Sequence, residues 1–215
     1  MLSPKLPAPL LRFYGAEALS PVAERFYRRG WTPATSSNLS LRVDERRALV
    51  TASGGHKRSL SGASLVLMDL DGTLLDGAEG AKPSAEAALH LALYARDPAI
   101  GAVLHTHAPS CVAWTLQAHA GAAVELAGQE LLKAFPGVAT HETHLAVPVV
   151  PNSQDMGTLD EAVVTAQRHL PGAPPAYLIA GHGAYCWGAT LFDAERHMEA
   201  LETLLAQALR PAPAA

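Results

Sequence analysis

Cysteine is scarce in this sequence, with only Cys111 and Cys186 among 215 residues. The two lie far apart and form no CxxC pair, and a disulfide between them is the alternative to two free thiols. A small domain stapled by disulfides needs more cysteines than this. We therefore expect two free, buried thiols in a reducing compartment.

Long apolar runs and basic blocks are also missing. No apolar stretch approaches the roughly 20 residues needed to cross a bilayer, so no membrane contact is predicted. Prolines interrupt residues 1–15 where a secretory leader would need an unbroken apolar segment, and we expect a cytoplasmic protein. The formal net charge is −4 and no stripe of Lys or Arg occurs, which argues against a nucleic-acid partner.

What is present is the composition of a globular protein, 49% apolar and 17% charged. Helical and strand-like patterns alternate along the chain without a long linker, which predicts one α/β domain over residues 1–209 and a flexible tail at 210–215. Helices are expected at 16–29, 84–97, 109–119, 156–170 and 191–209. Strands are expected at 38–43, 47–52, 64–70, 101–107, 146–150 and 176–187.

The stretch "VLMDLDGTLLD" at 66–76 allows two interpretations. An apolar run that ends in Asp-x-Asp-Gly-Thr resembles the start of a haloacid-dehalogenase-type phosphatase, in which Asp69 would be the nucleophile. Asp71-Gly72 between two apolar runs is equally a strong signal for a β-hairpin. The phosphatase also needs a later acidic pair at a strand end to hold Mg²⁺, and no strand-like run after residue 76 supplies one. The hairpin is the better prediction.

Ten histidines occur, and three of them end apolar strand-like runs. In "AVLHTH", His105 and His107 are two residues apart, so both would project from one face of a strand. In "LIAGHGAYCW", His182 lies between glycines that let the backbone approach a ligand closely. Three histidines around a divalent ion with one open position form a catalytic zinc arrangement, whereas capping of strand ends is the plainer alternative. The other histidines lack this pairing and are expected at the surface or behind the site, although His141 and His144 in "THETH" are candidates for a pocket lining.

Two loops are rich in hydroxyl, amide and glycine groups, "TSSNLS" at 35–40 and "TASGGHK" at 51–57. Such loops can present N–H donors to a phosphate, with charge supplied by Lys57, but each is also an ordinary polar turn. Ser84 is a candidate N-cap at a helix N-terminus, which is another anion site. Glu86 in that helix and Glu130 in "AGQELLKAF" are candidates for proton transfer. The structural alternative for Glu86 is a favourable interaction with the helix dipole. The structural alternative for Glu130 is an exposed ion pair with Lys133 on the same expected helix.

Together, "SSNLSLR", "TASGGHK", "DLDG", "KPSAE", "AVLHTH" and "AGHGAYCWG" resemble the class II aldolase/adducin family over about residues 15–205. The resemblance implies a single three-layer α/β/α domain with a central, mostly antiparallel sheet, in which the "DLDG" hairpin is structural. It also implies a homotetramer with active sites between neighbouring subunits.

The resemblance assigns roles to the candidate residues. His105, His107 and His182 are expected to bind one Zn²⁺ per subunit. The substrate phosphate is expected on the loops of Asn38, Ser53, Gly54, Lys57 and Ser84.

Within the family, "GWTPATSSN", "GQELLKAFPGVATHE" and "VPVVPNSQDM" resemble the lyases that dehydrate 5-methylthioribulose 1-phosphate, a phosphorylated ketose, in methionine salvage. Glu130 matches the acid/base residue of that subgroup, and Glu86 matches that of the sugar-phosphate aldolases. Because the chain has both, a class II aldolase or epimerase is the alternative enzyme. An adducin-like scaffold is the non-enzymatic alternative, although a scaffold has no need of the metal ligands.

Two positions depart from the family pattern. Ser37 stands where the family usually has Gly, and Ala85 replaces the second Ser of the aldolase P-S-S-E motif. The second change removes one phosphate donor and favours the dehydratase over the aldolase.

Overall fold

The computed structural model describes residues 4–117 and 123–209, which form two compact units. The first unit comprises Met1–Thr106 and Trp187–Ala194, and the second comprises His107–Cys186 and Glu195–Ala215. The predicted tail at 210–215 and His119 lie outside the described residues.

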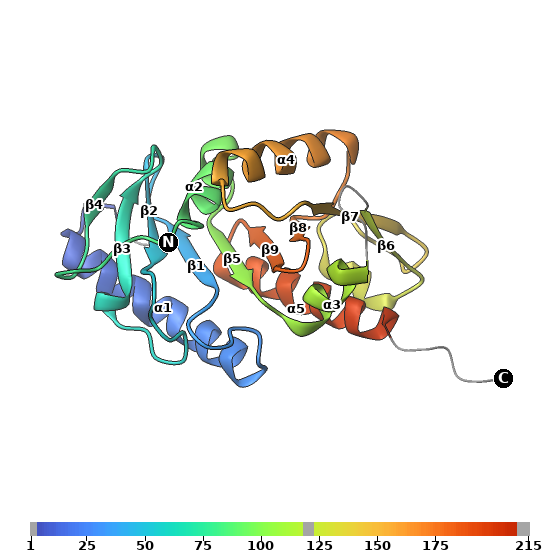
Figure 1. The fold of residues 1–215 in the computed structure, drawn as a ribbon, viewed down its shortest axis with the longest axis horizontal. Helices are drawn as coiled ribbons and strands as arrows, with labels where there is room; N and C mark the ends of the chain where they lie inside the picture. The colour runs from blue at the N-terminus through green and yellow to red at the C-terminus, as the bar shows by residue number, and fades with distance from the viewer. Residues whose placement is uncertain (1–3, 118–122, 210–215) are drawn as a thin grey trace. The chain divides into compact units, whose positions relative to one another are not determined.

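The described chain is a mixed α/β structure (Figure 1). Its nine strands follow the sheet order β4-β3-β2-β1-β5-β9-β8-β7-β6. The strands are β1 Asn38–Arg42, β2 Arg47–Thr51, β3 Leu65–Asp69, β4 Leu74–Asp76, β5 Ala102–Thr106, β6 Ala123–Ala127, β7 His144–Val150, β8 Ala176–Ile179 and β9 Gly183–Gly188. The helices are α1 Ala8–Arg28, α2 Ala87–Arg96, α3 Pro109–Gln117, α4 Met156–His169 and α5 Leu191–Ala208, with 3₁₀ turns η1 Gly62–Ser64 and η2 Glu130–Ala134.

The direction of pairing confirms a mostly antiparallel sheet. Antiparallel pairs are β1–β2, β1–β5, β2–β3, β3–β4, β6–β7 and β8–β9, and β7–β8 is parallel. The predicted α/β class with a central sheet is therefore confirmed.

In the first unit, strand β1 is covered on both faces. Leu41 pairs with Leu49 across β1 and β2, and Leu49 lies against Gly15 of α1. Ser40 projects to the opposite face, because successive strand side chains alternate, and contacts α2. This alternation explains why β1 is buried along nearly its whole length and why its polar residues face α2.

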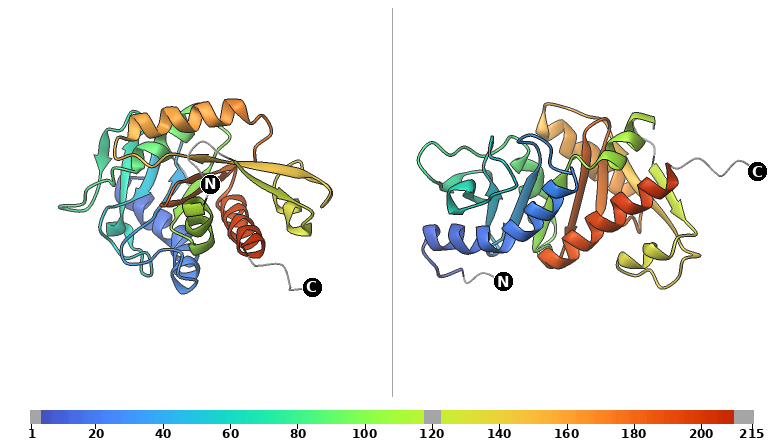
Figure 2. Two further views of the ribbon diagram at one scale, coloured as in Figure 1. Left: turned by 45° about the vertical axis from the view of Figure 1, so that its right-hand side comes forward. Right: turned by 90° about the horizontal axis from the view of Figure 1, so that it is seen from below.

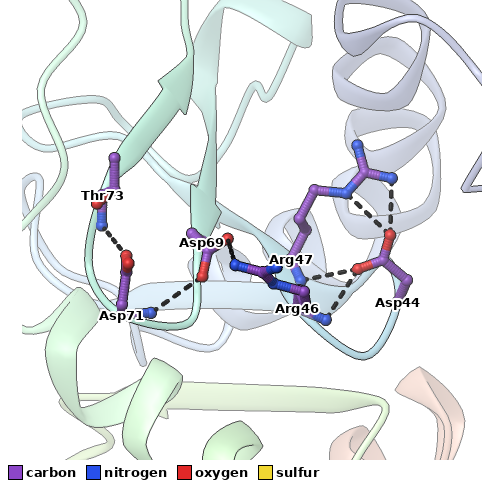
Figure 3. Close-up of polar contacts among 6 residues, drawn as sticks. All are labelled: Asp44, Arg46, Arg47, Asp69, Asp71 and Thr73. Atoms are coloured by element: carbon purple, nitrogen blue, oxygen red, sulfur yellow. Dashed lines mark hydrogen bonds and ion pairs between the residues drawn. The ribbon is translucent and has the colours of Figure 1, made fainter.

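The "DLDG" segment is the turn of a β-hairpin, as predicted (Figure 3). Gly72 has φ of +95°, which a residue with a side chain rarely adopts, and its N–H donates to the Asp69 carbonyl. The Asp69 carboxylate accepts from the Asp71 N–H and lies 3.6 Å from Arg46. Asp71 accepts from the Thr73 N–H, which lowers the pKa of Asp71. These carboxylates hold a turn together, and the phosphatase interpretation has no support here.

In the second unit, α4 lies on one side of β7 and β8, and α3 and α5 lie on the other (Figure 2). Tyr177 of β8 and Tyr185 of β9 stack with ring centroids 4.8 Å apart. Asp155 caps α4 by accepting from the Thr158 N–H, so this helix begins at 156 as predicted.

Several predicted boundaries were wrong. Helix α1 begins at Ala8 rather than 16, because a proline in the first turn of a helix costs no hydrogen bond. Helix α2 begins at Ala87 rather than 84, since Pro83 is held in a β-bridge to Ala52 and residue 84 remains outside the helix. The predicted helix around Glu130 is only the short turn η2, and strand β6 was not predicted.

Both cysteines are free and fully buried, which confirms their prediction. Within residues 4–117 and 123–209, no helix combines the length and apolar character that crossing a bilayer requires.

Candidate metal centre and active site

The first unit places His105 beside Glu86. His105 lies near the end of β5 and is fully buried, and its Nε2 is 3.7 Å from Glu86 Oε1. Glu86 is the N-cap residue of α2, and its carboxylate is about one-fifth exposed. A carboxylate and an imidazole therefore share one partly accessible position at the strand end.

Asn38 fixes the second oxygen of Glu86. Its side-chain N–H donates to Glu86 Oε2 at 2.5 Å and lies 3.4 Å from Ser84 Oγ. The register between β1 and β5 pairs Asn38 with His105. Asn38 thus meets Ser84 and Glu86, which lie 46 and 48 residues further along the chain, next to the His105 imidazole.

Lys57 brings a buried positive charge to the same region. Only 1% of the residue is exposed, and its Nζ donates to the carbonyls of Gly55 at 2.9 Å and Thr35 at 3.3 Å. Burial lowers the pKa of Lys57 to about 8, and the nearby charge of Glu86 opposes this shift. Ser53 and Gly54 are exposed in the loop that precedes Lys57.

A buried network supports this part of α2. Ser40 Oγ lies 2.8 Å from both His90 Nδ1 and the Tyr94 hydroxyl. Burial lowers the pKa of His90 to about 3, so its imidazole is neutral at physiological pH. His90 follows Glu86 by one helical turn, and its contact with Ser40 ties the base of that turn to β1.

The second unit holds the other two predicted metal ligands. His107 follows the end of β5 and His182 occupies the turn between β8 and β9. Their rings meet edge to face, with centroids 4.7 Å apart and planes at 85°. Gly181 precedes His182 with φ of +64°, so the turn uses the conformational freedom of glycine.

These pairs belong to one group of potential ligands. One ligand atom from each of four residues lies within 4.8 Å of all the others, and the residues are Glu86, His105, His107 and His182. Imidazole nitrogens and a carboxylate oxygen are the donors that suit a divalent ion such as zinc, and three histidines are the ligand set of some catalytic zinc sites. The donor set and its close spacing therefore fit a metal ion.

Glu130 is not a member of this group. Its carboxylate, 69% exposed, is hydrogen-bonded to Lys133, and His141 Nδ1 lies 3.5 Å from its other oxygen. The Lys133 hydrogen bond holds the pKa of Glu130 below its usual value, so the carboxylate is ionised at neutral pH.

The family described as "Class II Aldolase and Adducin N-terminal domain" matches residues 17–209. The chain belongs to the class II aldolase/adducin family. Among curated class II relatives, the methylthioribulose-1-phosphate dehydratase of Pseudomonas aeruginosa is 49% identical over 186 residues, covering 85% of this chain and 87% of the relative. The enzyme of the same name from Marinobacter nauticus is 43% identical over 189 residues, covering 88% and 89%.

Solved class II structures share the fold. YgbL from Escherichia coli superimposes with a TM-score of 0.75 at 27% identity, covering 97% of this chain and 93% of that one. The L-fuculose-1-phosphate aldolase from Thermus thermophilus gives a TM-score of 0.71 at 25% identity, covering 90% and 92%.

The structure thus gathers most of the predicted site residues. The three histidines and Glu86 form the ligand group, and Asn38 and Ser84 adjoin Glu86. The prediction that Ser84 caps α2 was wrong, although its hydroxyl does accept from the Glu86 N–H at 3.3 Å. The supporting contacts of Ser40 with His90 and Tyr94 were missed, because they join β1 to α2 across 50 and 54 residues and leave no local pattern.

Proposed function

We propose that this protein is a metal-dependent lyase that dehydrates 5-methylthioribulose 1-phosphate to 2,3-diketo-5-methylthiopentyl 1-phosphate in methionine salvage. The observation that carries this proposal is the 49% identity, over 85% of the chain, to relatives named methylthioribulose-1-phosphate dehydratase. The histidine and glutamate group supports it, since a non-catalytic scaffold has no use for four convergent ligand atoms.

We assign the metal to His105, His107 and His182, with Zn²⁺ as the proposed ion. A bound divalent ion would supply Lewis acidity toward the ketone oxygen of the substrate. Asn38, Ser53, Gly54, Lys57 and Ser84 are proposed to bind the phosphate. Lys57 suits that role because its buried ammonium is protonated below about pH 8.

Glu130 is the proposed acid/base residue. Its carboxylate would remove the proton from C3, and the electron pair would move toward the C2 ketone. The C4–O bond then breaks and the hydroxyl departs with a proton as water. The resulting enol is protonated at C4 and loses the proton of its C3 hydroxyl, which completes the diketone, so one water is lost and no oxidant or reductant is needed.

Glu86 has a different environment from Glu130. Asn38 donates to one oxygen of Glu86, and His105 lies near the other. We propose that Glu86 positions the ligand group rather than carrying the proton.

A general base must come within hydrogen-bonding reach of the proton that it removes. The exposure of Glu130 and its place outside the four-residue group are compatible with an active site completed by a neighbouring subunit. We therefore propose a cytoplasmic homotetramer with sites shared between subunits.

An aldolase is the second candidate, favoured by the 25% identity to an L-fuculose-1-phosphate aldolase and by the presence of Glu86 at the position of the aldolase base. The test is incubation of zinc-loaded protein with 5-methylthioribulose 1-phosphate, followed by mass spectrometry. Loss of one water is the expected result. Cleavage to dihydroxyacetone phosphate and an aldehyde would instead identify an aldolase.

Two variants separate the roles of the glutamates. Glu130→Gln is expected to keep its zinc and lose dehydration by at least about 100-fold, the usual scale for a proton-transfer group. Retained activity in Glu130→Gln together with inactive Glu86→Gln would reverse the two assignments.

A further inference from the structure

We propose that Glu202 and Thr115 are positioning residues that hold His107 and His182 in metal-binding register through helix α3. This inference rests on the proposed metal-dependent function, but it concerns residues outside the ligand group. Both side chains are buried in the second unit, Glu202 at 7% exposure and Thr115 at 2%.

Glu202 holds the end of α3 that follows His107. The helix begins at Pro109, two residues after this ligand. One oxygen of the Glu202 carboxylate accepts from the Ser110 N–H at 2.9 Å, and the other accepts from the Cys111 N–H at 3.1 Å. A carboxylate that bridges two N–H groups at a helix N-terminus gains from charge-assisted hydrogen bonds and from the helix dipole. The start of α3 is thereby fixed to α5.

Thr115 holds the turn that carries His182. Its hydroxyl lies 2.8 Å from the Val112 carbonyl, to which it donates, and it accepts from the Gly181 N–H at 3.0 Å. Gly181 is the residue before His182 and lies in the turn beyond Ile179 and Gly183, the last pair of the β8–β9 ladder, so its N–H is outside that ladder. The Thr115 hydroxyl therefore supplies the acceptor that the turn needs.

Helix α3 connects the two anchors over less than three turns. A displacement at either end would shift one of two imidazoles whose centroids are 4.7 Å apart. Metal affinity is sensitive to such shifts, because ligand geometry must match the ion closely. Cys111 at the start of α3 is not among the four residues of the ligand group.

The test compares zinc dissociation constants, measured by competition with a chromophoric chelator at a temperature where each variant is fully folded. Thr115→Val keeps the shape of the side chain but removes the acceptor, and Glu202→Gln removes the charge. We expect each to bind zinc about 10- to 100-fold more weakly than the unmodified protein. Thr115→Ser keeps the hydroxyl and should retain the original affinity. Excess zinc should restore the turnover of Thr115→Val.

Trp114→Phe is the matched control. It removes the hydrogen bond from Trp114 Nε1 to the Leu205 carbonyl, which also joins α3 to α5 but lies at neither anchor. We expect this variant to be less stable and to bind zinc with unchanged affinity.

Unchanged zinc affinity in Thr115→Val and Glu202→Gln would overturn the inference, as would equal losses in Thr115→Ser and Thr115→Val. If the unmodified protein binds no divalent ion, the proposed metal-dependent function fails. The positioning role is then judged from crystal structures, in which Thr115→Val should displace His182 relative to His107, and an unmoved His182 would refute it.

Discussion

The pKa of Lys57 differs from that of an ordinary exposed lysine, and the difference affects both the proposed phosphate site and the stability of the protein. Its pKa falls from 10.5 to about 8 because burial disfavours the ammonium. The proposed phosphate site therefore keeps a protonated lysine at neutral pH, at a cost to the stability of the free protein. That cost has a defined pH dependence.

Between about pH 8 and 10.5 the unfolded chain retains the Lys57 proton and the folded chain has released it. Stability rises with pH wherever the unfolded state binds more protons, so the free energy of unfolding should rise across this window. Below pH 8 both states hold the proton and the contribution is constant. Relative to Lys57→Met, the gain should reach at most about 3 kcal/mol.

The measurement is urea unfolding of metal-free protein from pH 7 to 10 at fixed protein concentration. Lys82→Met is the control, because Lys82 is exposed and should leave the slope in place. A pH dependence that is identical in Lys57→Met and the unmodified protein would contradict the assignment of this shift to Lys57.

At the scale of elements, the loop between α1 and β1 contains a residue in a strained backbone conformation. Ser37 stands where the family usually has glycine, and it has φ of +77°. This left-handed conformation is unfavourable for residues with a side chain. Its hydroxyl gains only a long contact of 3.5 Å to the Trp31 carbonyl.

We expect Ser37→Gly to raise the free energy of unfolding by about 0.5–1 kcal/mol, because glycine adopts this conformation freely. Ser36→Gly provides the opposite control, since residue 36 is not among the residues with positive φ and its hydroxyl lies 2.7 Å from the Pro33 carbonyl. That variant should lose stability. Thermal and urea unfolding of both variants measure the difference, and a destabilised Ser37→Gly would show that the hydroxyl outweighs the strain.

The elements also show how far the sequence could predict the site. His105, His107 and His182 lie at or just beyond strand ends, where an apolar run followed by a polar residue is a local signal, and all three joined the ligand group. The Asp71-Gly72 hairpin was equally local and was confirmed.

Strand β6 and the anchor Glu202 gave no such signal. The alternation of β6 rests on Val124 and Leu126 within an alanine-rich stretch, which is weak evidence for a strand. Glu202 contacts residues 91 and 92 positions away, and such a contact depends on the packing of α3 against α5 rather than on any local pattern. Residues that support a site through such long-range contacts can therefore be identified only from the folded structure.

At the scale of the whole molecule, an experiment can test whether His107 and Glu130 of one active site come from different subunits. Glu130 lies outside the ligand group, and its carboxylate is 69% exposed. In the proposed homotetramer, one subunit would supply the metal and its neighbour would supply Glu130. Each single variant, His107→Ala or Glu130→Gln, should then be inactive by itself for a different reason.

Mixed tetramers that contain both variants should regain activity, because some sites combine an intact metal centre with an intact Glu130. For a ring in which each site draws on two adjacent subunits, random mixing in equal amounts leaves about a quarter of the sites complete. Co-expression with two affinity tags isolates the mixed species, and the dehydration assay measures its activity. Mixing either variant with the double variant His107→Ala/Glu130→Gln should restore nothing. If verified mixed tetramers of the two single variants also stay inactive, both residues act within one subunit and the shared active site is wrong.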